Sequence, residues 1–398
     1  MERNTGQVRA LMVDSETTWR GGEGQLGLLI RGLMEREIDV RLAAPPGSAI
    51  AKRARELGVE CLPLPIAGGF DLSAVRKLGR YLGGGRYDII HCHSSHAHSI
   101  AFMANASLGF RSRGKRVRRP RLVVSRRVDF PVGRRGLGAL KYRRGVDVYL
   151  AISSGVRDVL IRCGIAPEKI ELVRSGIDLE KFDTVCDPAY LAREFELGPD
   201  TTIIGNIAAL APHKSQADFI RAAKLIKDST ENVKFLIVGE GELRGELEDL
   251  VRELDLERDV VLTGFREDVL EILSMFNCFV LSSYLEGLCT SIMDAQAMGI
   301  PVVATRVGGV PDLVVDGETG LLVPPRRPDL IAKAVIRMLG DDGLRERCVR
   351  QAIQKSRTYD YRRMVEQTVD AYHRILNLTH NEPAQGSVGD VKHTAGAL

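Results

Sequence analysis

Short apolar segments alternate with amphipathic helical segments along almost the whole chain, and no other feature limits the fold as strongly. Val8–Val13 is the first apolar segment, and a turn containing Gly21-Gly22 follows it. The helical segment after this turn has one apolar face, at spacings of three, four and seven residues: Leu26, Leu29, Ile30 and Leu33. Strands that alternate with helices in this order form mostly parallel sheets, so the sequence predicts an α/β fold.

The chain of 398 residues is too long for one ordinary core and predicts two domains. Residues 175–200 interrupt the alternation, and a second series of strands and helices begins at Thr202–Ala208. We therefore expect two doubly wound, Rossmann-like sheets, with ligands bound at the carboxyl ends of the strands in a cleft between the domains. The predicted ranges are 1–178 for the N-terminal domain, 179–359 for the C-terminal domain, 360–376 for a last helix and 379–398 for a disordered tail.

Composition excludes several other classes of protein. The content of 44% hydrophobic and 27% charged residues is typical of a globular enzyme and not of a disordered chain. No apolar run approaches the ~18 residues that a membrane-spanning helix needs. The seven cysteines are scattered and form no C-x-x-C pair, which argues against a disulfide framework or a structural zinc site. We therefore expect a protein of the reducing cytoplasm.

Positive charge is concentrated in one part of the chain. Residues 111–144 contain fourteen Lys or Arg and a single acid, Asp129. Such a segment indicates a polyanionic partner. The portion Arg111–Arg121 suits an anionic membrane surface, although a solvated loop is the alternative. Nucleic acid is not expected, because aromatic residues are not interleaved with the basic ones.

The stretch Ser282–Pro325 carries the strongest chemical signal. A strand is predicted to end at Ser282, and a helix to begin near Thr290. The free N–H groups and the dipole of such a helix start favour an anion, and a diphosphate fits well. Glu286 lies before this turn and Asp294 lies eight residues later, inside the helix. Two carboxylates in these positions can accept hydrogen bonds from sugar hydroxyls on either side of a diphosphate.

With its neighbouring motifs, this stretch resembles the retaining, nucleotide-sugar-dependent glycosyltransferases of family 4, which have the GT-B fold. The family signature is Glu, seven residues, Glu, a Pro-Val-Val strand and a Gly-Gly-x-Pro-Glu loop. The corresponding residues here are Glu286 and Asp294, Pro301-Val302-Val303, and Gly308-Gly309-Val310-Pro311-Asp312. The resemblance covers most of residues 8–376. It implies two Rossmann-like domains that face each other across a cleft, with the helix 360–376 crossing back to the N-terminal domain.

The resemblance also implies roles for individual residues. Three are expected to act in catalysis: Glu286 on the donor sugar, Lys214 on the leaving phosphate and His93 beside the reacting sugar. The expected donor-binding residues are Gly287, Leu288, Cys289, Thr290, Ser291, Asp294, Phe265, Arg266, Gly21 and Gly22. Phe265 fits a core position equally well.

No metal and no cofactor beyond the nucleotide sugar are expected. The sequence has no Asp-x-Asp motif, and Lys214 with the helix start supplies the positive charge that the leaving group needs. The histidine run has no matching cysteines or carboxylates that would complete a metal site: His91, His93, His96 and His98.

Three departures from the family pattern affect the predicted site. The second acid is Asp294, one methylene shorter than the usual Glu. Five residues before Lys214 the family usually has Arg, whereas this chain has Ala209, with Arg306 and Arg266 as candidate substitutes. Where the family often has a histidine, this chain has Arg126 and Arg127, which suit a phosphorylated or carboxylated acceptor because Arg binds such groups with two hydrogen bonds.

The predicted function is metal-independent transfer of a sugar, with retention, from a nucleoside diphosphate donor to a lipid-linked or polysaccharide acceptor. The expected location is the cytoplasm, with attachment to the inner face of the membrane through Arg111–Arg121. Two alternatives stay open: a sugar-nucleotide epimerase or phosphorylase on the same fold, and a non-catalytic nucleotide-sugar-binding protein. A glycoside hydrolase using Glu286 and Asp294 explains neither Lys214 nor the glycine-rich loops.

Overall fold

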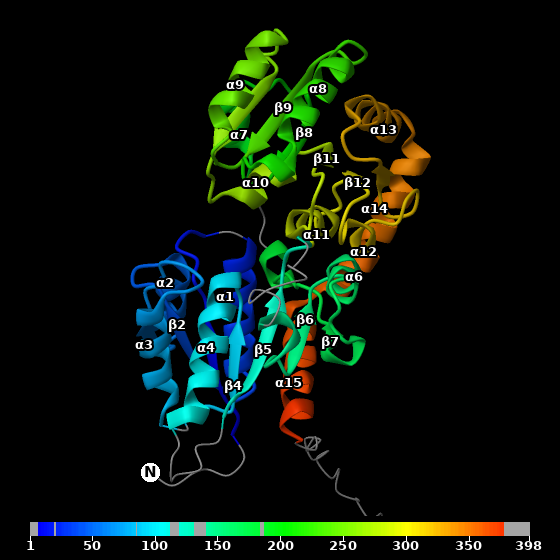
Figure 1. The fold of residues 1–398 in the computed structure, drawn as a ribbon. Coiled ribbons are helices and arrows are strands. Elements are labelled where there is room, and N and C mark those ends of the chain that lie inside the picture. The colour runs from blue at the N-terminus through cyan, green and yellow to red at the C-terminus, as the bar shows by residue number, and fades with distance from the viewer. Residues whose placement is uncertain are drawn as a thin grey trace, which may run out of the picture.

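The computed structural model describes residues 7–19, 21–84, 86–111, 119–130, 141–183 and 187–377. These residues form two domains, each built on one parallel sheet between helices, and Figure 1 shows one domain above the other. The α/β fold expected from the sequence is therefore confirmed.

The N-terminal sheet has seven parallel strands in the order β3-β2-β1-β4-β5-β6-β7. The strands are β1 (Arg9–Val13), β2 (Asp39–Ala44), β3 (Cys61–Pro63), β4 (Ile89–Cys92), β5 (Arg121–Arg126), β6 (Val148–Ala151) and β7 (Ile170–Leu172). The helices between them are α1 (Gly21–Met34), α2 (Ala49–Glu56), α3 (Leu72–Leu82), α4 (Ser95–Arg111) and α6 (Ser154–Arg162). The strand order reverses between β1 and β4, and such a switch point is where doubly wound sheets bind ligands.

The C-terminal sheet has six parallel strands in the order β10-β9-β8-β11-β12-β13. The strands are β8 (Thr202–Ile207), β9 (Val233–Val238), β10 (Val260–Gly264), β11 (Cys278–Leu281), β12 (Val302–Thr305) and β13 (Leu321–Val323). The helices are α7 (Ala189–Glu194), α8 (Gln216–Lys227), α9 (Arg244–Glu253), α10 (Val269–Ser274), α11 (Thr290–Ala297), α12 (Val310–Leu313), α13 (Pro328–Gly340) and α14 (Asp342–Ser356). Its switch point lies between β8 and β11.

Alternation along the strands divides the N-terminal core into two layers. In β1, Ala10 and Met12 pack against one group of helices, whereas Leu11 and Val13 pack against the other. This is the two-residue period of a strand buried on both faces. The second layer continues into the C-terminal domain, where it includes Leu288 beside the start of α11.

The last helix, α15 (Tyr361–Leu376), returns to the N-terminal domain and lies beside it in Figure 1. It packs against α1 and completes the layer that contains Met12. At Gly32 of α1, an added Cβ would lie 2.5 Å from Val365 Cγ2, so the two helices touch where no side chain intervenes. The expected return of the C-terminal helix to the first domain is therefore confirmed.

Candidate active site

Lys214 and Glu286 meet because their strands are neighbours. Lys214 ends a short 3-10 helix, Pro212–Lys214, that follows β8, and Glu286 lies in the loop after β11. Since β8 and β11 are parallel and adjacent, their carboxyl ends lie together at one edge of the sheet. Lys214 Nζ lies 2.5 Å from Glu286 Oε2, and Ser283 Oγ lies 3.3 Å from the same oxygen.

The Lys214–Glu286 pair is mostly withdrawn from solvent. The exposed fractions of the two side chains are 16% and 10%. Burial alone would lower the pKa of Lys214, but the negative groups around it, with Glu286 foremost, raise that pKa above its usual value. The lysine therefore keeps its charge at neutral pH and remains able to stabilise an anion.

The start of α11 lies close to this pair. Its N-cap residue, Cys289, makes no side-chain capping bond, and the N–H of Ile292 donates to the Cys289 carbonyl oxygen at 3.2 Å. The N–H groups of Thr290 and Ser291 are therefore available to an acceptor stronger than a thiol. Ser291 Oγ instead donates to the carbonyl oxygen of Ile207, 3.1 Å away. Burial raises the pKa of the Cys289 thiol to about 11, which keeps it neutral. The helix start is thus a suitable place for an anion.

Asp294 lies one turn inside α11, where it is nearly enclosed by protein. Its Oδ1 accepts a hydrogen bond of 2.8 Å from Lys181 Nζ. Burial raises the pKa of Asp294, and Lys181 opposes this rise. The carboxylate therefore already has one partner on the segment between the two domains.

The N-terminal domain contributes a glycine turn opposite α11. An added Cβ at Gly21 would lie 3.8 Å from Thr290 Oγ1, so the start of α1 faces the start of α11. An added Cβ at Gly287 would lie only 2.1 Å from the carbonyl oxygen of Arg127. Position 287 therefore requires glycine, because the two backbones meet there across the domain junction.

His93 follows β4 at the switch point of the N-terminal sheet. Its Nδ1 lies 3.3 Å from Arg127 Nη2, and its Nε2 lies 3.4 Å from Met12 Sδ. Burial lowers the pKa of His93 well below its usual value, so the ring is neutral at pH 7. Behind it, His91 is hydrogen-bonded to Tyr372 OH of α15 and to Ser125 Oγ, at 2.7 and 2.8 Å. Through Tyr372, the last helix α15 therefore contacts His91, whose ring is next to that of His93.

Three of the predicted site residues have surroundings that differ from those of the Lys214–Glu286 pair. Arg126 is buried, donates to the carbonyl oxygen of Phe130 and lies over the ring of Tyr142. Phe265 is 64% exposed. Arg266 forms ion pairs with two carboxylates, at 2.5 Å to Glu194 and 2.6 Å to Asp268.

Neither cation suggested as a substitute at Ala209 is without a partner. Arg266 pairs with the two carboxylates just named, and Arg306 pairs with Asp316 at 3.0 Å. Both would have to exchange an existing carboxylate partner for a phosphate.

Asp129 is a site residue that the sequence analysis did not select. It is half-buried beside Glu286, whose backbone N–H is a hydrogen-bond donor to it, and burial raises the pKa of its carboxyl group. The available signal was its position as the single acid among the basic residues 111–144. Asp129 brings a second carboxylate from the N-terminal domain towards Lys214.

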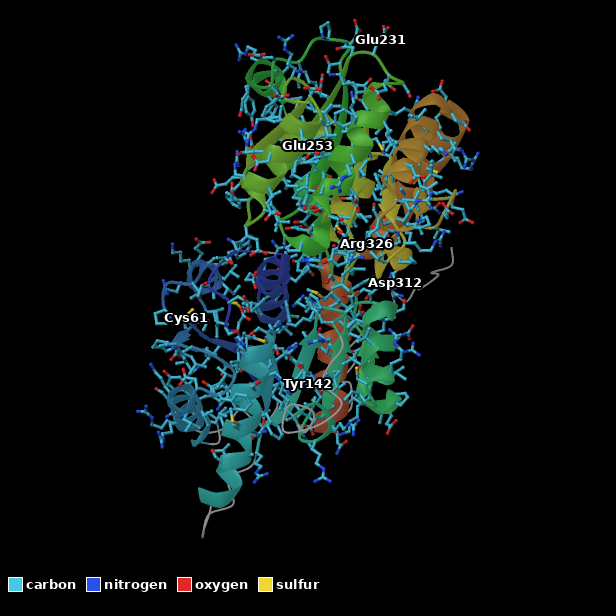
Figure 2. The ribbon with its side chains drawn as sticks, turned by 45° about the horizontal axis from the view of Figure 1, so that its top comes forward. Cys61, Tyr142, Glu231, Glu253, Asp312 and Arg326 are labelled. Atoms are coloured by element: carbon cyan, nitrogen blue, oxygen red, sulfur yellow. The ribbon has the colours of Figure 1, made fainter. Side chains whose placement is uncertain are left out.

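A second set of contacts fastens the two domains. Ser153 Oγ donates to the carbonyl oxygen of Gly287 at 2.7 Å, and Ser154 N donates to Asp312 Oδ2 at 2.8 Å. Arg174 also pairs with Asp312, at 3.4 Å. Figure 2 shows Asp312 at the junction of the domains. These contacts hold the Gly287 loop and the Gly-Gly-x-Pro-Asp loop against the N-terminal domain.

Two negative observations apply to the residues that the structure describes. No helix in these ranges is long and apolar enough to cross a membrane. Within the same ranges, no group of three or more His, Cys, Asp or Glu side chains is arranged to hold a metal ion.

Known proteins resemble this chain in both sequence and fold. A family model described as glycosyltransferase family 4 matches residues 19–181, and one described as glycosyl transferases group 1 matches residues 191–355. The Escherichia coli enzyme UDP-Gal:α-D-GlcNAc-diphosphoundecaprenol α-1,3-galactosyltransferase is 30% identical over 44% of this chain and 47% of its own. The N-acetyl-α-D-glucosaminyl L-malate synthase of Bacillus anthracis is 26% identical over 69% of this chain and 71% of its own. This chain spans about half the length of several curated relatives that it matches.

Among solved structures, that of Anabaena HepE with UDP and glucose has a TM-score of 0.80 at 18% identity, over 92% of this chain and 100% of its own. Two facing parallel sheets with a returning last helix are the GT-B fold. The two adjoining family matches then show that the chain belongs to the GT-B glycosyltransferases of the family 4 type. The expected fold and family are both confirmed.

Proposed function

We propose that the protein transfers a sugar, with retention, from a nucleoside diphosphate donor to a glycan or lipid-linked acceptor. The observation that carries this proposal is the buried Lys214–Glu286 pair beside the open start of α11. This arrangement places a cation, a carboxylate and free N–H groups within one small region. A nucleoside diphosphate sugar offers complementary groups: an anion, sugar hydroxyls and further phosphate oxygens.

Each group has a physical role in the proposed reaction. Lys214 and the start of α11 stabilise the negative charge that builds on the leaving diphosphate. Glu286 accepts hydrogen bonds from the donor sugar, and Asp294 accepts them from the ribose. The acceptor oxygen bonds to the anomeric carbon on the face from which the diphosphate leaves, and a phosphate oxygen takes the acceptor proton. Cys289 remains a neutral thiol and is not suited to act as a covalent nucleophile.

Named relatives suggest which substrates to try first. One relative's name contains a UDP-galactose donor and a diphosphoundecaprenol acceptor, and HepE was crystallised with UDP and glucose. We propose UDP sugars as the first donors and a polyprenyl-diphosphate-linked sugar as the first acceptor.

Product analysis tests this function. The protein is incubated with UDP, GDP and ADP sugars, with and without acceptor, and the anomeric configuration of the product is read by NMR. Transfer that requires the acceptor and keeps the donor configuration supports the proposal. A changed sugar nucleotide formed without acceptor would identify an epimerase. Binding without turnover on any acceptor would identify a non-catalytic binding protein.

Sugar transfer is expected to continue in the presence of EDTA. Lys214 and the α11 start carry the phosphate charge in the proposed mechanism, so no divalent cation is required. Initial rates are measured in EDTA and in added magnesium or manganese. Complete loss in EDTA with recovery on adding metal would contradict the metal-free mechanism.

The basic segment Arg111–Arg121 lies mostly outside the described residues, and we propose that it binds an anionic membrane surface. Replacing Arg116, Arg118 and Arg119 by Ser removes three charges, each contributing about 1 kcal/mol, so binding to phosphatidylserine vesicles is expected to weaken roughly 100-fold. Co-sedimentation at increasing salt measures the effect. Vesicle binding equal to that of the parent would leave the segment as a solvated loop.

A further inference from the structure

Most of the cations named at or near the donor site are already paired with carboxylates. The shortest contacts are Lys214–Glu286 at 2.5 Å, Lys181–Asp294 at 2.8 Å, Arg266–Glu194 at 2.5 Å and Arg306–Asp316 at 3.0 Å. A diphosphate gains negative charge when the glycosidic bond breaks. A further cation beside the diphosphate would add to the stabilisation that Lys214 and the helix start provide.

Arg127 differs from these cations. No carboxylate among the described residues forms an ion pair with it, and its side chain instead contacts His93, a neutral ring. Its Nε is buried and has no hydrogen-bond partner within the described ranges. Burial lowers the pKa of Arg127 to about 10, although the nearby Glu23 and Asp14 oppose this effect. The guanidinium is therefore still protonated at pH 7, and it belongs to a half-buried side chain that pairs with no carboxylate of the described residues.

A charge withdrawn from solvent is costly unless something compensates it. A guanidinium also presents N–H donors in a planar fork, which matches phosphate oxygens with two parallel hydrogen bonds. Arg127 therefore has both the charge and the donor geometry to bind an anion such as a phosphate.

The position of Arg127 indicates which anion it would take. Its Cδ lies 3.7 Å from the point that a Cβ on Gly22 would occupy. The adjacent Gly21 faces Thr290 at the start of α11, and the Arg127 carbonyl oxygen abuts Gly287. The arginine is therefore beside the turn where the donor diphosphate is proposed to lie.

We propose that Arg127, from the N-terminal domain, binds the diphosphate of the nucleotide-sugar donor together with Lys214 of the C-terminal domain. This inference rests on the proposed function and replaces the acceptor-binding role expected from the sequence. The diphosphate would then be held by cations from both domains.

Isothermal titration calorimetry tests this assignment on the full chain. The probes are the diphosphate that the parent binds most tightly among UDP, GDP and ADP, the matching monophosphate, and inorganic pyrophosphate. Arg127→Gln is expected to weaken diphosphate and pyrophosphate binding by about 10- to 100-fold, as loss of a charge-assisted hydrogen bond does. Binding of the monophosphate should weaken about threefold or less. Arg127→Lys should fall between parent and Gln variant, because it keeps the charge without the fork.

The matched control is Arg144→Gln, which removes an exposed arginine from the same domain and should leave all three affinities unchanged. Thermal unfolding separates binding from structure: Arg127→Gln removes a half-buried charge that pairs with no carboxylate of the described residues, so its midpoint should equal or exceed that of the parent. Diphosphate affinity equal to that of the parent in Arg127→Gln overturns the assignment, and so does a loss of folding in both Arg127 variants. A parent that binds no diphosphate contradicts the proposed function itself.

Discussion

Replacing Lys214 by Met or Glu286 by Gln is expected to reduce sugar transfer by at least about 100-fold, the usual effect of losing one group that stabilises transition-state charge. Each side chain lies within the buried pair at the start of α11. Initial rates at saturating donor measure the loss. Near-normal turnover in either variant would show that the chemistry occurs elsewhere.

Stability measurements distinguish this catalytic loss from a folding defect. Removing one partner of a buried ion pair leaves the other charge unpaired and costs about 3–5 kcal/mol of unfolding free energy. The double variant, Lys214→Met with Glu286→Gln, has no such charge and should recover most of that stability while staying inactive. Lys227→Met is the matched control, because Lys227 forms a lysine–aspartate pair with Asp259 in the same domain but outside the site. It should leave turnover unchanged.

A chain that ends at Tyr359 is expected to lose the folded N-terminal domain. Truncation removes α15 and its large buried side chains: Tyr361, Met364, Val365, Val369 and Tyr372. Burial of each such side chain stabilises by roughly 1.5–3 kcal/mol. Their sum is comparable to the ~5–15 kcal/mol that stabilises a typical domain.

Circular dichroism during heating, with limited trypsin digestion, measures this loss. A chain ending at residue 380 keeps all of α15 and should unfold at the midpoint of the parent. Glu366→Ala, an exposed position on the same helix, should also be neutral. An unchanged midpoint after truncation at Tyr359 would mean that α15 does not complete the N-terminal core.

The fold was predictable because its signals are local. The apolar segment expected at Val8–Val13 is β1 (Arg9–Val13), and the helix expected over 360–376 is α15 (Tyr361–Leu376). The strands β3, β7 and β13 have three residues each, too few to show a period. Local pattern thus located the longer elements but not the short edge strands.

The site was only partly predictable because side-chain direction and contacts across domains are not local properties. Arg126 and Arg127 were expected to act together on an acceptor, but consecutive residues at the end of a strand point to opposite sides. Arg126 accordingly packs on Tyr142, whereas Arg127 reaches His93 at the domain junction. Asp129 belongs to the candidate site only because the fold places it beside Glu286, which is distant in the sequence.

The return of α15 to the first domain also sets an order of events during synthesis. Residues 361–376 emerge from the ribosome after both sheets have been made. The C-terminal domain can therefore be complete while one face of the N-terminal sheet still lacks the last of its helices. Domains usually fold in the order in which they are translated. Here the first domain made is the last to be finished, because its core stays incomplete until α15 packs against α1 and β6.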